Sequence, residues 1–263
     1  MLSQDQLDEF DHSGLLRLPG AVAASEAGTM RDGIWTYLKD HQGIERERKG
    51  TWPVTTTPLS GFQPLVRSGV FDGIGNAVVS DVIDDLLGRR LWRRERGRVL
   101  VTFPQPDIPW IIPTAGWHID VGSSHPRAVQ LFVLLDDLDH QGGGTLVLTG
   151  SHHLVNQYVA STGLAPHPRA IKSTLASTYP WLAGLLGKHP ESDESDRVRR
   201  YMKEGEVIDG VDLRVVELHG SAGDAFIMNS DCFHTGVPNN REIPRMMVTT
   251  MATRIEPPKN ILA

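Results

Sequence analysis

The sequence predicts a mainly β protein with flanking helices, built on a double-stranded β-helix (jelly-roll) core. Helical periodicity predominates in the first third of the chain, and short strand-like segments separated by Gly- and Pro-containing turns fill most of the rest. No internal repeat interrupts this pattern. We therefore expect one domain over residues 1–263, with a largely helical part over 1–95 and a jelly-roll core over 96–256. An insertion over 153–210 divides the core.

The first third contains three segments with helical spacing. Ser3 is a typical N-cap for a short helix that carries Leu7 and Phe10. Apolar residues recur at helical spacing over Ala21–His41 and again, four positions apart, over Val70–Leu87. We expect an amphipathic helix in each of the two longer segments.

The core is predicted from alternating or continuous apolar runs that end in turn residues. Glycine-rich or polar turns are expected at 136–144 and at 150–152, on either side of a short strand. The expected strands are Arg98–Phe103, Ala128–Leu135, Thr145–Thr149, Leu213–Leu218, Asp224–Met228 and Met246–Met251.

The insertion over 153–210 is expected to be long, polar and partly helical, with an apolar stretch at 170–186 and a highly charged one at 191–200. A long excursion inside a compact domain is often a lid or a binding loop. A solvated surface insertion is the alternative. As a lid, it would be most mobile near its charged stretch.

Composition limits the partners and the chemistry. The net charge of −6 argues against a nucleic-acid partner, and no apolar run is long enough to span a bilayer, so neither nucleic acid nor membrane is expected. The opening residues lack the pattern of a signal peptide, and Cys232 is the only cysteine, which together predict a cytoplasmic protein. Any metal must then be held by histidines and carboxylates.

The most informative motif is His118-Ile119-Asp120. Side chains at i and i+2 of a strand leave the same face, so this imidazole and this carboxylate can bind one metal ion. His234, far downstream, is the candidate third ligand. Two histidines and one carboxylate form the facial triad of non-haem Fe(II) oxygenases. A surface histidine beside a solvated aspartate is the alternative interpretation.

Four ordered segments make the assignment more specific. The chain resembles the phytanoyl-CoA dioxygenase (PhyH-like) family of Fe(II)/2-oxoglutarate oxygenases. The segments are Trp117-His118-Ile119-Asp120, the stretch 135–139 leading to Gly144, Gly150-Ser151-His152, and 234–239 followed by Arg245. This resemblance implies that Fe(II) is bound by His118, Asp120 and His234, that 2-oxoglutarate is the co-substrate, and that O2 is consumed.

The resemblance also implies that Arg245 binds the distal carboxylate of 2-oxoglutarate. A guanidinium matches a carboxylate in a planar, two-on-two arrangement and stays charged at any working pH. Arg241, in the preceding turn, is the competitor. Thr145 and Phe132 occupy positions that contact the co-substrate in part of the family. Each has a structural alternative, as a β-branched strand residue and a core aromatic respectively.

The resulting hypothesis is a dioxygenase that hydroxylates an unactivated C–H of a small molecule and releases succinate and CO2. Desaturation, ring formation and epimerisation would use the same site. Related halogenases carry Gly or Ala where this chain has Asp120, and no phosphate-binding pocket for a CoA ester is evident. A non-catalytic jelly-roll binding module and a metal hydrolase are the alternatives from other classes.

Overall fold

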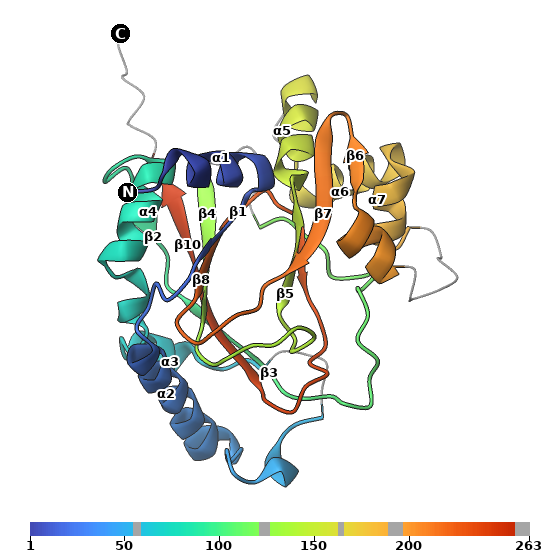
Figure 1. Ribbon diagram of the computed structural model, residues 1–263. Helices are drawn as coiled ribbons and strands as arrows, with labels where there is room; N and C mark the ends of the chain where they lie inside the picture. Colours follow the sequence, from blue (N-terminus) through green and yellow to red (C-terminus); the bar gives the residue numbers. More distant parts are fainter. Residues whose placement is uncertain (55–58, 121–126, 163–165, 189–196, 256–263) are drawn as a thin grey trace.

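Two antiparallel sheets face each other, and helices lie on the outer side of each sheet (Figure 1). The computed structural model describes residues 1–54, 59–120, 127–162, 166–188 and 197–255. None of the helices in these ranges is long and apolar enough to cross a membrane.

The larger sheet has six strands in the order β1-β8-β4-β10-β2, and β3 also pairs with β10. All its pairings are antiparallel. Strand β4 is buried along its whole length, which fits its sequence, apolar at every position except Gln130. The strands are β1 (Leu15–Leu18), β2 (Trp92–Arg94), β3 (Arg98–Thr102), β4 (Ala128–Leu134), β8 (Ala225–Asn229) and β10 (Arg245–Arg254).

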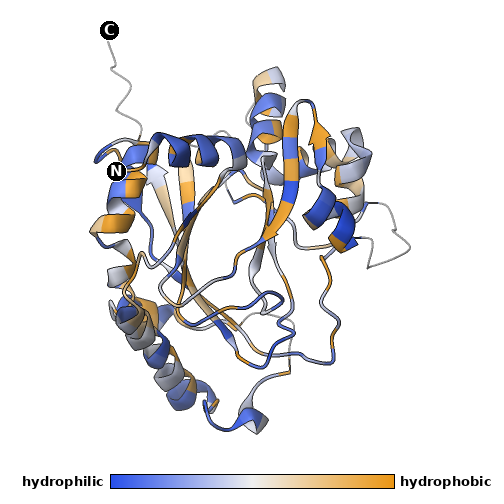
Figure 2. Cartoon of the chain, viewed as in Figure 1, coloured by the Kyte–Doolittle hydropathy of each residue, from blue (hydrophilic) through white to orange (hydrophobic). Residues whose placement is uncertain are grey.

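The smaller sheet has four strands in the order β6-β7-β5-β9. They are β5 (Thr145–Thr149), β6 (Glu206–Ile208), β7 (Val211–Glu217) and β9 (His234–Gly236). Figure 2 shows hydrophobic and hydrophilic residues alternating along β7, as expected for a strand with one buried face. All six predicted strands are confirmed. The sequence analysis missed β1, β2, β6 and β9, which have three or four residues each and are too short for a periodic signal.

The N-terminal helices are α1 (Gln4–Ser13), α2 (Ala24–Gln42), α3 (Gln63–Arg67) and α4 (Ala77–Leu87), with 3-10 turns at Lys49–Thr51 and Asp72–Gly75. The N-cap at Ser3 is confirmed, since its side chain accepts a hydrogen bond from the backbone N–H of Gln6. The prediction of one helix over 70–87 is wrong in its first half. Asn76 caps α4 by accepting from the N–H of Val79, so the helix begins only at Ala77.

Side chains along each strand of the larger sheet point alternately to an outer face, which the N-terminal helices cover, and to an inner face, which the smaller sheet covers. Val129, Leu131 and Val133 of β4 pack outward against the N-terminal helices, whereas Phe132 and Leu134 point inward. The inner cluster also contains residues of the smaller sheet and so fills the space between the sheets. Because residues of α2 and α4 pack with the outward-facing residues of β4, these two helices do not line the inner space.

The insertion contributes helices α5 (Ser151–Thr162), α6 (Pro168–Thr178) and α7 (Pro180–Leu185) and a π-helical turn, Arg199–Glu204. The turn predicted at 150–152 is shorter than expected, because α5 already begins at Ser151. These helices share a core with the smaller sheet, on its outer side (Figure 1). Of the charged stretch at 191–200, residues 191–196 lie outside the described ranges, and the adjoining Arg197 is buried and donates to the carbonyl of Ile112.

Candidate metal centre and co-substrate site

His118 and His234 are brought together by their backbones. His234 opens β9, which pairs with β5 so that His234 lies opposite Val147. His118 lies in no regular strand, contrary to expectation. It is joined to His234 by an isolated antiparallel bridge, in which each residue donates its N–H to the carbonyl of the other, at 3.0 and 2.9 Å. The bridge therefore fixes the separation of the two side chains.

Both imidazoles are hydrogen-bonded through Nδ1, which leaves Nε2 of each ring free to bind a metal ion. Nδ1 of His118 donates to the carbonyl of Gly116 at 2.8 Å, and Nδ1 of His234 donates to the carbonyl of Cys232 at 3.1 Å. Because a carbonyl can only accept, each ring carries its proton on Nδ1 and presents the lone pair of Nε2. A backbone carbonyl on the other ring nitrogen is the usual support for a metal-binding histidine.

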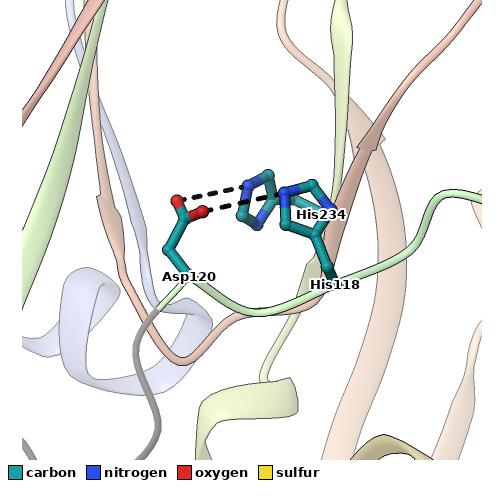
Figure 3. A group of neighbouring side chains, drawn as sticks. All are labelled: His118, Asp120 and His234. Carbon is teal, nitrogen blue, oxygen red and sulfur yellow. Dashed lines mark ion pairs between the residues drawn. The ribbon is translucent and has the colours of Figure 1, made fainter. Parts of the chain in front are cut away.

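Asp120 completes the group, as Figure 3 shows. Its Oδ1 lies 3.7 Å from Nε2 of His118, and its Oδ2 lies 3.5 Å from Nε2 of His234. One ligand atom from each residue can be chosen so that all three lie within 4.8 Å of one another. Neighbouring ligands on an ion with bonds of about 2.1 Å are roughly 3 Å apart, so a small contraction would bring these atoms to bonding distance.

The donor set fits a divalent metal ion. Oδ2 of Asp120 is buried and accepts no hydrogen bond from the residues that the structure describes, so this carboxylate oxygen is left without a donor among them. Burial lowers the pKa of His234 to about 4, although the negative charge of Asp120 opposes the shift. His234 is therefore neutral near pH 7, which is the form that binds a metal. Nitrogen and carboxylate ligands in this ratio suit Fe(II).

Access to the centre is one-sided. The side chain of His118 is 54% exposed, whereas those of His234 and Asp120 are 7% and 14% exposed. The exposed imidazole therefore marks the side from which a ligand reaches the group.

Arg245 lies on the inner face of the larger sheet, at the start of β10. It is buried, and its guanidinium donates to the hydroxyl of Thr102 at 2.5 Å and to the sulfur of Met247 at 3.8 Å, while Nε has no partner. No carboxylate among the described residues pairs with it. Burial lowers its pKa to about 10, which still leaves it charged at neutral pH. A buried, unpaired cation costs several kcal/mol, and an anionic ligand would offset that cost.

Arg241 has a different environment from Arg245. Its side chain is exposed, and Nε donates to the carbonyl of His140 at 2.8 Å. It therefore lies on the surface turn that the sequence analysis assigned to it.

Comparison with known proteins gives the family. The chain matches the phytanoyl-CoA dioxygenase (PhyH) family over residues 10–247. It belongs to that family. The matched range includes both histidines, Asp120 and Arg245.

Curated relatives in the family are distant in sequence. An ectoine dioxygenase of Bordetella parapertussis is 22% identical over 180 residues, which are 68% of this chain and 58% of that protein. The chain thus spans little more than half the length of this relative. An ectoine dioxygenase of Nocardia farcinica is 20% identical over 254 residues, which are 96% of this chain and 78% of that protein.

Solved structures share the fold at low identity. The epimerase SnoN in complex with Fe3+, alpha ketoglutarate and nogalamycin RO aligns with a TM-score of 0.56 at 15% identity, over 95% of this chain and 83% of that one. EvdO2 from Micromonospora carbonacea aligns with a TM-score of 0.56 at 16% identity, over 99% and 96%. HygX from Streptomyces hygroscopicus with nickel, 2-oxoglutarate and hygromycin B bound aligns with a TM-score of 0.52 at 15% identity, over 96% and 88%.

The other two residues expected to contact the family's co-substrate are both buried. Thr145 pairs with Gly236 of β9, two positions before Val147, the partner of His234. The ring of Phe132 meets the ring of His234 edge-on, with centroids 6.5 Å apart. Phe132 also belongs to the inner apolar cluster, so both the core and the site interpretations agree with its position.

Two site residues were missed in the sequence analysis. Thr102 bonds Arg245, and strand alternation places it on the inner face with Leu100, a signal that was available in the strand over 98–103. Lys172 of α6 donates from Nζ to the carbonyl of Trp117, next to His118, at 2.7 Å. Nothing in the local sequence around Lys172 indicates this contact, because it joins the insertion to a segment 55 residues away.

Proposed function

We propose that this protein is an Fe(II)/2-oxoglutarate-dependent oxygenase that acts on a small molecule and uses O2. The proposal depends on the presence of two separate features in the same fold. One is the His118, Asp120 and His234 group with its free ligand atoms, and the other is the buried, unpaired guanidinium of Arg245. Family membership and the ectoine dioxygenase relatives support the same activity.

In this proposal His118, Asp120 and His234 hold Fe(II), and Arg245 binds the distal carboxylate of 2-oxoglutarate. Thr102 orients the guanidinium, Thr145 is placed to bond the co-substrate, and Phe132 closes the apolar side of the site. The iron would supply the redox chemistry that couples 2-oxoglutarate decarboxylation to oxidation of the substrate. The chain would supply fixed ligand positions, a counter-charge for the co-substrate and an apolar enclosure that limits water.

We infer hydroxylation of an unactivated C–H as the outcome, with release of succinate and CO2. Asp120 occupies the position that a halide would need, which disfavours halogenation. A zinc hydrolase would have no use for a buried cation at Arg245, and a vestigial binding module would have no reason to keep both features. Neither alternative therefore accounts for the pair.

We further propose a single domain with a jelly-roll core over 96–256, acting in the cytoplasm. The shared fold with oxygenase structures and the cores that join the helices to each sheet support this organisation. For the insertion over 153–210, the contact of Lys172 with the backbone beside His118 supports a role at the site.

The test is succinate formation. Anaerobically prepared protein should bind one Fe(II), and on addition of 2-oxoglutarate and O2 it should produce succinate. A substrate screen should then detect a product heavier by one oxygen atom. Metal binding without succinate under any condition would leave the binding module or the hydrolase, and hydrolysis of an ester panel with zinc would identify the latter.

A further inference from the structure

Besides Arg245 and Thr102, three polar residues lie on the inner face of the larger sheet near the candidate metal ligands His118, Asp120 and His234. They are Gln130 of β4, Thr249 of β10 and Arg98 of β3. Thr249 pairs directly with Phe132 on one side and with Arg98 on the other, and directly opposed residues in antiparallel strands project from the same face. Because the Phe132 ring meets the His234 ring, this cross-strand row lies level with the metal ligands.

The hydrogen bonds around Gln130 determine which end of its amide is free. Thr249 donates its only hydroxyl proton to the carbonyl of Leu131 at 2.8 Å, so its oxygen can only accept from Gln130. Nε2 of Gln130 makes that bond at 2.5 Å, which leaves Oε1 as the free end of the amide. Gln130 is 3% exposed and its Oε1 has no partner. A buried acceptor left unpaired commonly costs about 1–3 kcal/mol, so a donor from a ligand would be favourable.

Arg98 presents a positive charge beside the same row. Its side chain is exposed and makes no hydrogen bond and no ion pair with the described residues. In this row Arg98 lies opposite Thr249 and two strands away from Phe132, whose ring meets the ring of His234. The guanidinium is therefore available to an anion that lies near the metal ligands.

The guanidinium of Arg98 lies too far from Arg245 for one molecule of 2-oxoglutarate to contact both. Arg245 pairs with Thr102, and Thr102 and Arg98 are four residues apart on β3, a separation of about 13 Å along the strand. The five-carbon chain of 2-oxoglutarate spans only about 5 Å. With its distal carboxylate on Arg245 and its other end at the metal, the co-substrate leaves Arg98 unpaired.

We propose that Gln130 and Arg98 are specificity-determining residues, which select a small carboxylic acid that also carries an N–H or O–H donor, as amino acids and hydroxy acids do. Oε1 of Gln130 accepts from the donor, and Arg98 pairs with the carboxylate. A carboxylate carries the single charge that one guanidinium balances. The inference rests on the proposed function, because it takes the inner face beside the metal group as the substrate site.

The test is equilibrium binding to protein loaded with Ni(II) and 2-oxoglutarate, which holds the site without turnover. The probes are the proteinogenic L-amino acids, their N-acetyl derivatives and the matching 2-hydroxy acids, each with its neutral carboxamide. We expect at least one acid to bind about tenfold or more tighter than its carboxamide, since a tenfold change is about 1.4 kcal/mol. Arg98→Gln should remove this preference, and Arg98→Lys should restore part of it.

Two further variants complete the design. Gln130→Leu should lower the affinity for the preferred acid by about three- to tenfold, which corresponds to the loss of one neutral hydrogen bond. Arg94→Gln is the matched control, because it removes the same charge from the opposite face, where Arg94 pairs with the outward-facing Ala252. It should leave the preference for acids unchanged.

Three results would overturn the inference. No acid in the panel binds, the carboxamides bind as tightly as the acids, or Arg98→Gln lowers the affinity for 2-oxoglutarate and not the affinity for the acid. Succinate formation by the wild-type protein with Fe(II), 2-oxoglutarate and O2 but no acid is measured in parallel. If succinate forms and the acids fail, only the substrate class is wrong. If succinate never forms, the proposed function itself fails, whatever the acids do.

Discussion

His118 and His234, 116 positions apart in the chain, exchange both of their backbone hydrogen bonds and hold their imidazole rings 4.2 Å apart. Such a two-way exchange is the hydrogen-bonded pair of an antiparallel ladder. The two candidate metal ligands are thus placed by the backbone, before any ion binds. A site assembled in this way should bind metal with little rearrangement of the chain.

Replacing His234 by alanine should abolish tight metal binding. Even the hydrogen-bonding partners of metal ligands commonly contribute 10- to 100-fold to affinity, so the loss of a ligand should exceed about 100-fold. Calorimetric titration of the metal-free protein with Fe(II) under anaerobic conditions measures this. His41→Ala, on the exposed side of α2, is the control and should bind like the wild type. Full affinity in His234→Ala would remove this residue from the metal centre.

Replacing Arg245 by lysine should raise the KM for 2-oxoglutarate by at least about tenfold. Positive charge is kept, but the planar pair of donors is lost, and disrupting a buried charged hydrogen bond commonly costs about 2–5 kcal/mol. Succinate formation against 2-oxoglutarate concentration gives the value. Arg241→Lys should behave like the wild type, since that side chain is exposed and bonds a backbone carbonyl. The opposite pattern would transfer the co-substrate role to Arg241.

The buried His152 should make the protein less stable at mildly acidic pH. Burial lowers its pKa from 6.5 to about 4 in the fold, where Nε2 donates to the carbonyl of Asp11 and Nδ1 faces the sulfur of Cys232. Between these two pH values the unfolded chain binds a proton that the folded chain excludes. The contribution to stability is therefore complete above pH 6.5 and decreases as the pH falls toward 4, by on the order of 3 kcal/mol in total.

Urea denaturation of wild type and His152→Gln at several pH values between 7.5 and 4 tests this. Carboxylates titrate in both proteins, so the difference between the two stability curves isolates His152. Below pH 6.5 we expect the free energy of unfolding of the wild type to fall more steeply than that of His152→Gln. Parallel curves would show that His152 is protonated equally in the folded and unfolded states.

Lys172 should stabilise the position of His118. Its Nζ bonds the carbonyl of Trp117, and burial lowers its pKa, so the contact lies in a partly dehydrated environment. Lys172→Met keeps the aliphatic chain but removes the donor, and we expect faster hydrogen exchange in the segment around His118 and weaker Fe(II) binding by several-fold. Lys203→Met, at an exposed position of the same insertion, is the control. Unchanged exchange and affinity would reduce the contact to a structural one within the insertion.

Much of the fold could be predicted because local sequence encodes it. Ser3 identifies the first helix, and the run of β4, apolar except at Gln130, identifies a strand buried on both faces. The start of α4 could not be placed, because apolar residues at helical spacing continue upstream into a 3-10 turn. Only the side chain of Asn76, bonding the N–H of Val79, sets that boundary.

The candidate site was predictable in identity but not in geometry. The sequence by itself predicted the candidate ligands, through the His118 and Asp120 spacing and the ordered family segments, and it favoured Arg245 over Arg241 for the co-substrate. Only the tertiary structure decided that His118 is positioned by a bridge rather than by a strand. It also decided that Thr102 bonds Arg245, that Lys172 bonds the backbone beside His118, and that Gln130 bonds Thr249 on the inner face. Local periodicity reports which face a residue occupies, whereas these contacts join residues 55 to 143 positions apart and depend on how the sheets pair.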